Sequence, residues 1–389
     1  MILFGAGLPT PPSRGGMKKK HKRETNNVAS KLWVATRKGL FGLERRGGSG
    51  DEWEIATKAF LGDNVSLVLP DARDGALYAA LSLGHFGAKL RRSDDRGATW
   101  TECAVPEYPK GDAETAPALK QFWSLEAAGP CVEDGLWAGT APGGLFLSRD
   151  RGATWELNRP LWERPERSKW FGGGTEHPAI HSVSVDPRDP RCVTVAVSCG
   201  GVSQTRDGGA TWASRADGMF AEYMPPDQQR DPDVQDPHCL VRCDAAPDAL
   251  WVAHHNGVFR STDDATSWQN ITGIKPSCFG FTVAVHPRDP QTAWFVPAVK
   301  DESRYPVDGR FVVARTRDGG LTSEVLTRGL PTETSYDIVF RHALAVDSTG
   351  NTLAAGSTTG HLWTTDNGGD DWCQLTAHLP PIYAVRFGD

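Results

Sequence analysis

The sequence lacks the features that would assign it to several large functional classes. Its net charge of −6 and pI near 6.0 give no basic footprint for nucleic acid or an anionic membrane surface. No apolar run approaches the ~20 residues that span a bilayer. Neither a Gly-x-Ser-x-Gly elbow, a P-loop nor a dinucleotide fingerprint occurs. We therefore expect a partner that is neither nucleic acid nor membrane.

Cysteine patterns for metals or disulfides are missing as well. None of the eight cysteines forms a Cys-x-x-Cys pair, and most lie in or beside expected strands. We expect buried free thiols in a reducing cytoplasm. The basic cluster at residues 17–24 is not followed by an apolar segment, so it does not match the pattern of a secretory signal peptide. The sequence predicts a cytoplasmic protein with a disordered basic tail over residues 1–29.

What the chain does contain is a repeat. A Ser/Thr-x-Asp-x-Gly-x-Thr-Trp phrase, intact or decayed, recurs at intervals of 49 to 57 residues, which indicates a repeat architecture. In the copy that opens at Ser93, Asp95 is expected to close a turn by bonding backbone N–H groups two residues on. Gly97 and Trp100 then supply a special backbone conformation and a large side chain that fills the gap between sheets. The six copies open at Ser93, Ser148, Thr205, Ser261, Thr316 and Thr365.

The phrase resembles the Asp-box of the BNR-repeat propeller families. These include sialidases, sortilin-type propellers, photosystem-assembly propellers and reducing-end xyloglucanases. Residues 30–389 as a whole are also similar to bacterial BNR-repeat proteins often called glycosyl hydrolases. The resemblance implies that each phrase joins the last two strands of a propeller blade. It names no reaction, because these relatives range from hydrolases to binding proteins.

Two apolar runs with a turn between them precede each phrase, which makes a four-stranded antiparallel unit. A seventh unit lacks the phrase: residues 31–36 and 39–43 are its expected second and third strands. Its first strand is expected at residues 382–387, so that pairing of the chain's two ends closes the ring and leaves no sheet edge. The predicted fold is all-β, one seven-bladed propeller over residues 30–389.

Histidines gather where inner strands begin and second strands end, positions that share one face of a propeller. Imidazoles from adjacent blades could enclose a divalent transition metal, namely Zn, Fe, Cu or Mn. The expected ligands are His181, His238 and either His254 or His255, with His85 and His342 as further candidates. The alternative is that these histidines only bond backbone carbonyls or water at the mouth of the propeller.

Two long connections, residues 156–180 and 213–237, and an extended hairpin at residues 300–309 suggest binding loops on that face. Their aromatic and acidic residues suit a small-molecule substrate, either a sugar or another polar-aromatic compound. A glycoside hydrolase needs two carboxylates across a cleft. The candidates are Glu176, Glu222, Asp301 and Glu302, of which Glu176 and Glu302 are the expected pair. Arg304 and Arg341 could hold an anionic group.

A sialidase is disfavoured because no Arg-Ile-Pro signature precedes the first phrases and a third arginine at the rim is not evident. Three functions remain open. The leading one is an enzyme with a His-bound metal in an axial pocket, acting on a small molecule. The others are a carbohydrate-active hydrolase that uses carboxylates at the rim, and a binding or assembly propeller without catalysis. The sequence does not indicate the oligomeric state.

Overall fold

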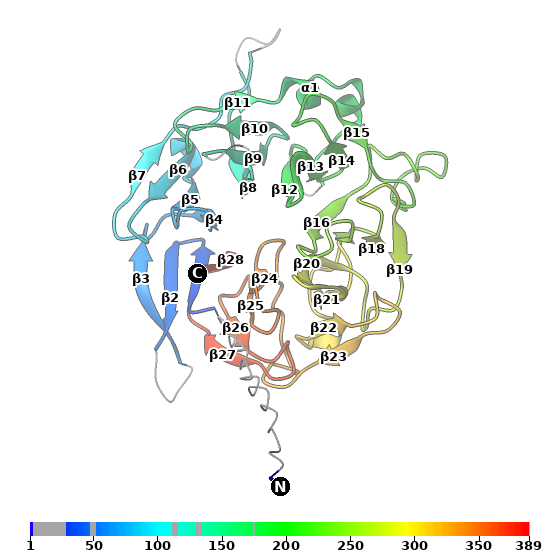
Figure 1. Ribbon diagram of the computed structural model, residues 1–389. Coiled ribbons are helices and arrows are strands. Elements are labelled where there is room, and N and C mark those ends of the chain that lie inside the picture. The colour runs from blue at the N-terminus through cyan, green and yellow to red at the C-terminus, as the bar shows by residue number, and fades with distance from the viewer. Residues whose placement is uncertain are drawn as a thin grey trace.

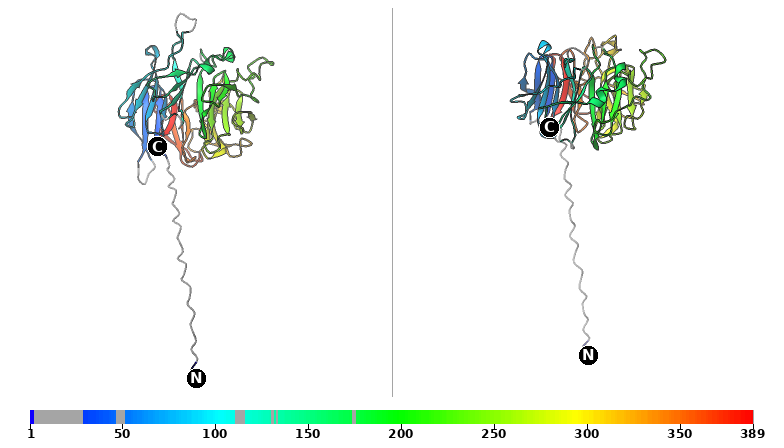
Figure 2. Two further views of the ribbon diagram at one scale, coloured as in Figure 1. Left: turned by 45° about the horizontal axis from the view of Figure 1, so that its top comes forward. Right: turned by 90° about the horizontal axis from the view of Figure 1, so that it is seen from above.

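The computed structural model describes residues 1–2, 29–46, 52–110, 116–129, 132, 134–173 and 176–388. Seven four-stranded antiparallel sheets surround a central axis (Figure 1), and the views from the side show a flat disc (Figure 2). The predicted seven-bladed propeller is confirmed. The predicted basic tail, residues 1–29, lies outside the described residues except for Met1, Ile2 and Ala29.

Each blade runs from an inner strand at the axis to an outer strand at the rim. Blades one to four contain β28 (Ile382–Gly388), β1 (Lys31–Thr36), β2 (Gly39–Arg45) and β3 (Trp53–Ala59); β4 (Val65–Pro70), β5 (Leu77–Ser82), β6 (Ala88–Ser93) and β7 (Thr101–Cys103); β8 (Gln121–Ala127), β9 (Leu136–Ala141), β10 (Leu145–Ser148) and β11 (Glu156–Leu157); and β12 (Ile180–Asp186), β13 (Asp189–Val197), β14 (Gly201–Thr205) and β15 (Ala213–Ser214). Blades five to seven contain β16 (Pro237–Arg242), β17 (Leu250–His254), β18 (Gly257–Ser261) and β19 (Gln269–Ile271); β20 (Gly280–His286), β21 (Asp289–Pro297), β22 (Val313–Thr316) and β23 (Glu324–Leu326); and β24 (Leu344–Val346), β25 (Leu353–Gly356), β26 (Leu362–Thr365) and β27 (Cys373–Thr376).

Helical structure is confined to short connections. The helical elements of the described residues are η1 (Gly84–Phe86), α1 (Arg159–Trp162), η2 (Pro165–Lys169) and η3 (Val307–Gly309). Among those residues, no helix has the length and apolar character needed to cross a membrane.

The two ends of the chain share blade one, as the sequence predicts. β28 pairs antiparallel with β1, from Lys31 opposite Gly388 to Thr36 opposite Ile382. β1 in turn pairs with β2. The sheet is therefore complete only when the last residues of the chain join the first strand, and no blade edge faces an open gap in the ring.

The repeated phrase forms the same hydrogen-bonded turn in each copy. In the first, the Ser93 hydroxyl accepts a bond from the Gly97 backbone N–H (2.8 Å) and Asp95 Oδ1 accepts one from the Thr99 N–H (2.8 Å). The Asp95 carboxylate thus bonds a backbone N–H four residues on; the prediction of two was wrong. The Thr99 hydroxyl also donates to Asp95 (2.6 Å), so the carboxylate holds both arms of the loop. Gly97 has a φ of +87°, the left-handed conformation expected of it.

The aspartates of these turns make the free energy of unfolding depend on pH in the acidic range. Hydrogen bonds from Thr99 and Thr211 lower the pKa of Asp95 and Asp207 to about 2. A carboxyl whose pKa is lower in the folded state stabilises the fold above its unfolded pKa of about 4, and that contribution disappears as pH falls toward 2. In the double variant Asp95→Asn, Asp207→Asn, the free energy of unfolding should change less between pH 4 and 2 than in the wild type. Denaturant titration at each pH measures this. Asp63→Asn, at an exposed carboxyl, is the control and should keep the wild-type slope.

Inner strands carry an irregularity near their first residues. In β16, Pro237 pairs with His254 and Cys239 with Ala253, so that His238 is an extra residue without a partner. Such a bulge re-aims a side chain. The bulged residues of five blades are Ser66, Trp123, His181, His238 and the pair Phe281–Thr282. The bulges place a set of side chains from successive blades around the axis.

Candidate functional site

A cavity of about 290 Å³ lies on the axis, at the end where the inner strands begin. Bulged residues, residues just ahead of the inner strands, and the hairpin of blade six form its wall. The lining consists of Asn64, Ser66, Gln121, Trp123, Gly173, Asp236, His238, Phe281, Asp301, Arg304, Phe340, Arg341, His342 and Tyr383. The structure therefore places the pocket at the positions predicted from the strand ends. We call it the axial pocket.

The axis continues beyond Arg341 and His342 into a second cavity of about 370 Å³. Its wall includes Glu126 and Arg386. Burial raises the pKa of Glu126 to about 7, against the opposing effect of Arg386. Because only the first cavity joins aromatic walls with the long loops of the rim, we place the candidate site there.

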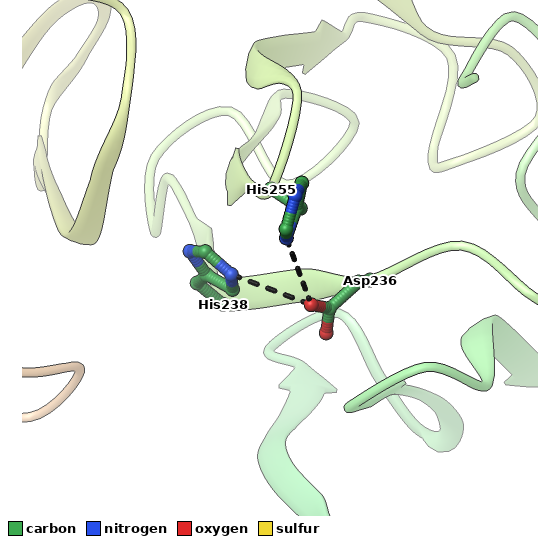
Figure 3. Close-up of side chains that lie close together, drawn as sticks. All are labelled: Asp236, His238 and His255. Carbon is green, nitrogen blue, oxygen red and sulfur yellow. Dashed lines mark ion pairs between the residues drawn. The ribbon is translucent and has the colours of Figure 1, made fainter. Parts of the chain in front are cut away.

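A carboxylate and two imidazoles meet beside the axial pocket (Figure 3). Asp236 lies directly ahead of β16, His238 in its bulge, and His255 directly after β17. Asp236 Oδ2 lies 3.5 Å from His238 Nε2 and 3.5 Å from His255 Nδ1. The other oxygen, Oδ1, accepts a hydrogen bond from the Cys199 N–H at 3.1 Å. The backbone of blade four thus holds Asp236 in place, and the cluster borders the pocket.

The carboxylate and the two imidazoles of this cluster interact electrostatically. Burial acts to raise the pKa of Asp236, but the imidazoles of His238 and His255 outweigh it and hold that pKa well below its usual range. Asp236 raises the pKa of His255. Within 4.0 Å of the Asp236 carboxylate, these two imidazoles are the groups of the described chain that can carry positive charge. The carboxylate is therefore ionised and has no arginine or lysine partner there.

Two arginines reach the axial pocket, as predicted. Arg304 donates to Asp301 at 2.7 Å and lies over the Phe281 ring at 5.2 Å. Arg341 lies over the Trp123 ring at 4.6 Å, and its Nε makes no hydrogen bond to the described residues. Burial lowers the pKa of Arg341. Arg304 is neutralised by its neighbour, whereas Arg341 offers a guanidinium to a ligand.

The structure does not bring the six predicted histidine ligands together. His238 and His255 meet at Asp236, but His181 Nε2 donates to the Pro237 carbonyl at 2.7 Å. His342 Nε2 likewise donates to the Trp123 carbonyl at 2.9 Å. The ring nitrogens of His254 face the backbone N–H groups of Asp236 (3.1 Å) and Asn256 (3.0 Å). His85 is an exposed residue of η1 that packs on Phe86. These four histidines therefore make local contacts only, as in the alternative in which they bind no metal.

Burial explains why the inward-facing rings stay neutral. It lowers the pKa of His254 and of His342 to about 3, and that of His181 well below its ordinary value. A ring that is neutral and bonded to a backbone group orders the mouth of the propeller. It is not placed to share an ion with His238.

The predicted catalytic pair lies outside the pocket lining. The Glu176 side chain is 81% exposed and faces His177 at 3.6 Å. Glu302 is 70% exposed and pairs with Lys300 at 3.6 Å. The carboxylates that do line the pocket are Asp236 and Asp301. Sequence reasoning missed Asp236, although its offset of two residues from His238 matches that of Asn64 from Ser66 and Gln121 from Trp123.

The two long connections pack on each other next to the pocket. Lys169 of the first pairs with Asp231 of the second at 2.7 Å, and the Phe171 and Tyr223 rings lie 6.4 Å apart. Tyr223 in turn contacts the His255 ring at 4.8 Å. Most of the predicted loop aromatics therefore hold the loops in place, and the second loop supplies Asp236 to the site.

A second group of potential ligand atoms, Asp186, Cys192 and Asp264, lies away from the axial pocket. Arg242 donates to Asp264 at 2.8 Å, and Arg188 donates to Asp186 at 2.7 Å. Arginines already neutralise these carboxylates, so this group is a buried ion-pair network.

No family model matches the sequence. Among curated proteins, the chain is 25% identical over 324 residues to a probable oligoxyloglucan-reducing end-specific xyloglucanase of Neosartorya fischeri, covering 76% of this chain and 37% of that protein. It is 27% identical over 234 residues to the oligoxyloglucan-reducing end-specific xyloglucanase of Emericella nidulans, covering 56% and 25%. The chain thus spans well under half the length of these relatives.

Solved structures share the fold. The GH74 xyloglucanase from Xanthomonas campestris superposes with a TM-score of 0.60 at 17% identity, covering 90% of this chain and 53% of that one. YCF48 bound to D1 peptide superposes with a TM-score of 0.50 at 13% identity, covering 88% of each chain. At such identities the likeness concerns the propeller alone.

Proposed function

We propose that the protein is a carbohydrate-active hydrolase that takes a terminal unit of a small saccharide into the axial pocket. Of the three functions expected from the sequence, the xyloglucanase relatives favour this one. The observation that carries the proposal is the pocket itself, where aromatic walls, amide groups and two carboxylates converge at the end of the axis.

The wall of the axial pocket suits a sugar ring. Trp123 and Phe281 add apolar atoms to the wall, against which the C–H groups of a pyranose can pack. Asn64 and Gln121 carry amides that can both donate to and accept from hydroxyl groups. Arg341 adds a fork of donors that has no carboxylate partner within 4.0 Å among the described residues.

The pocket's size favours a terminal unit. Its volume of about 290 Å³ is at the lower limit of ligand pockets, which span roughly 300–1,000 Å³. The loops at residues 156–173 and 213–236 pack against each other beside it. A long polysaccharide needs an open groove, whereas this wall suits the end of a short chain.

Hydrolysis of a glycosidic bond requires a base for water and a proton for the leaving oxygen. The ionised Asp236, between His238 and His255, is assigned to the water: it takes up a proton as the water oxygen bonds to the anomeric carbon. Asp301, the other acid of the wall, is assigned to the leaving oxygen: in its protonated form it gives that oxygen its proton as the carbon–oxygen bond breaks. Arg304, which lies 2.7 Å from Asp301, positions it, and the ion pair between them re-forms once the proton has left.

A pair of neighbouring variants tests this assignment. Asp301→Asn should lower kcat/KM by at least about 100-fold, the range for loss of a general acid or base. Glu302→Gln, next to it on the same hairpin, should retain wild-type activity because its side chain is exposed and pairs with Lys300. Release of reducing ends from short oligosaccharides, oligoxyloglucan among them, and from aryl glycosides is the measurement.

A loss of activity in the glutamate variants instead would support the catalytic pair predicted from the sequence, Glu176 and Glu302. If Glu302→Gln and Glu176→Gln abolish turnover while Asp301→Asn does not, the reaction takes place at the outer rim. If the wild type hydrolyses none of these saccharides but binds one of them or a peptide at the axial pocket, the protein is a binding propeller and the proposal fails.

A further inference from the structure

The side chains around Asp236 are spaced for a bound ion rather than for direct hydrogen bonds. His238 Nδ1 lies 2.9 Å from the Gly280 carbonyl oxygen, which can only accept, so Nδ1 carries the hydrogen. Nε2, the other nitrogen of the ring, faces Asp236 Oδ2 at 3.5 Å, which exceeds the 2.7–3.2 Å of an N–H···O hydrogen bond. A metal ion between the two atoms could bind to both.

We propose that Asp236, His238 and His255 bind one divalent first-row transition-metal ion. A metal 2.0–2.2 Å from each donor atom in tetrahedral geometry separates the donors by roughly 3.3–3.6 Å. Both distances from Asp236 Oδ2 to the imidazole nitrogens are 3.5 Å. All three donor atoms lie within 4.8 Å of one another. Figure 3 shows both rings directed at the same carboxylate oxygen.

The surroundings orient each ligand. The Gly280 carbonyl fixes the tautomer of His238, as carbonyls and carboxylates do for metal-bound histidine. The Cys199 N–H occupies the Asp236 oxygen that faces away from the rings. Phe279 and Phe281 pack on the His238 ring, with centroids 5.6 and 4.9 Å from it. A donor set whose rotamers and tautomer are fixed in advance is what a metal site needs.

The chemistry of the three donor atoms limits which metal ions can bind. Two imidazoles and one carboxylate suit zinc or ferrous iron, whereas calcium and magnesium prefer oxygen donors alone. Three protein ligands leave a position for water or substrate, and Asp236 and His238 both line the axial pocket. The ion would lower the pKa of a bound water, which would then take the place of the water deprotonated by Asp236, since Asp236 would be a ligand. The inference rests on the pocket of the proposed function but not on its reaction.

Cobalt titration tests the site directly. Untagged protein stripped with a chelator is titrated with Co²⁺, whose visible d–d absorption reports tetrahedral coordination, and Zn²⁺ is then added in competition. We expect saturation at about one ion per chain. His255→Ala, at a partly exposed ring, should fold and bind at least about ten-fold more weakly. His85→Ala, at an exposed histidine outside the pocket lining, is the control and should bind as the wild type does.

Two results would overturn the inference: no d–d absorption at saturating Co²⁺, or equal affinity in the wild type and His255→Ala. Its failure is distinguishable from that of the proposed function. A chain that binds one ion but hydrolyses no saccharide retains the metal site and loses the hydrolase. A stripped chain that hydrolyses at the full rate and binds no ion retains the hydrolase and loses the metal site.

Discussion

Asp236→Asn should lower kcat/KM for hydrolysis by about 1,000-fold and leave the fold intact. The substitution keeps the shape of the side chain, so its oxygen can still accept from the Cys199 N–H. It removes the negative charge between His238 and His255. The general base is then lost, which costs 10²–10⁴-fold, and so is the one anionic donor of the proposed metal site.

The measurement pairs steady-state kinetics with thermal unfolding of the same samples. Asp227→Asn is the control, since Asp227 belongs to the same loop but is exposed. It should match the wild type in both readouts. If Asp236→Asn keeps kcat/KM within ten-fold of the wild type, Asp236 takes no part in the reaction and the water must be activated elsewhere in the pocket. A large fall in melting temperature would instead assign Asp236 a structural role.

Blade order and ring closure could be predicted because local and global signals agree. The repeated phrase marks the turn between the last two strands in six of the seven blades, and the apolar runs before it mark the first two strands. From those marks the sequence predicted that residues where the inner strands begin share one face of the ring; Trp123, Phe281 and Arg341 are at or near such positions, and all three line the pocket. The ring closes through β28, which was predicted as residues 382–387 and extends to Gly388.

Which side chains face the pocket could not be predicted, because that depends on bulges and rotamers. His181 and His238 are the bulged residues of adjacent blades, and each bonds a carbonyl at the start of the next inner strand. His181 does so through Nε2, which leaves Nδ1 to Ser182. His238 does so through Nδ1, which leaves Nε2 to Asp236. A strand pattern contains no information on which ring nitrogen bonds a carbonyl. The prediction from the sequence therefore gave His181 and His238 the same role.

Asp236 was missed for a related reason. It lies in a long connection with several other acidic residues, and no turn or strand signal sets it apart. The carboxylates selected, Glu176 and Glu302, lie in the other long connection and in the hairpin of blade six, and their side chains are 81% and 70% exposed. Loop composition thus indicated the correct region, whereas the register of β16 decides which acid enters the site.

Ile382→Ala should lower the free energy of unfolding by about 2–5 kcal/mol, as for other fully buried isoleucines. Ile382 has no exposed surface and opens β28, the strand that closes the ring against β1. Its side chain packs so closely on Gly356 that a Cβ there would lie 2.5 Å from it. Loss of this contact weakens both the core and the junction of the chain's two ends.

Ile382→Asp should go further and prevent folding, because an ionised carboxylate in this apolar environment has no partner. Leu321, which is 77% exposed, provides matched controls: Leu321→Ala and Leu321→Asp should change stability by no more than about 0.5 kcal/mol. Urea unfolding followed by tryptophan fluorescence measures all four variants. If Ile382→Ala matches Leu321→Ala, β28 is dispensable, and blades two to seven hold the ring without the pairing of its ends.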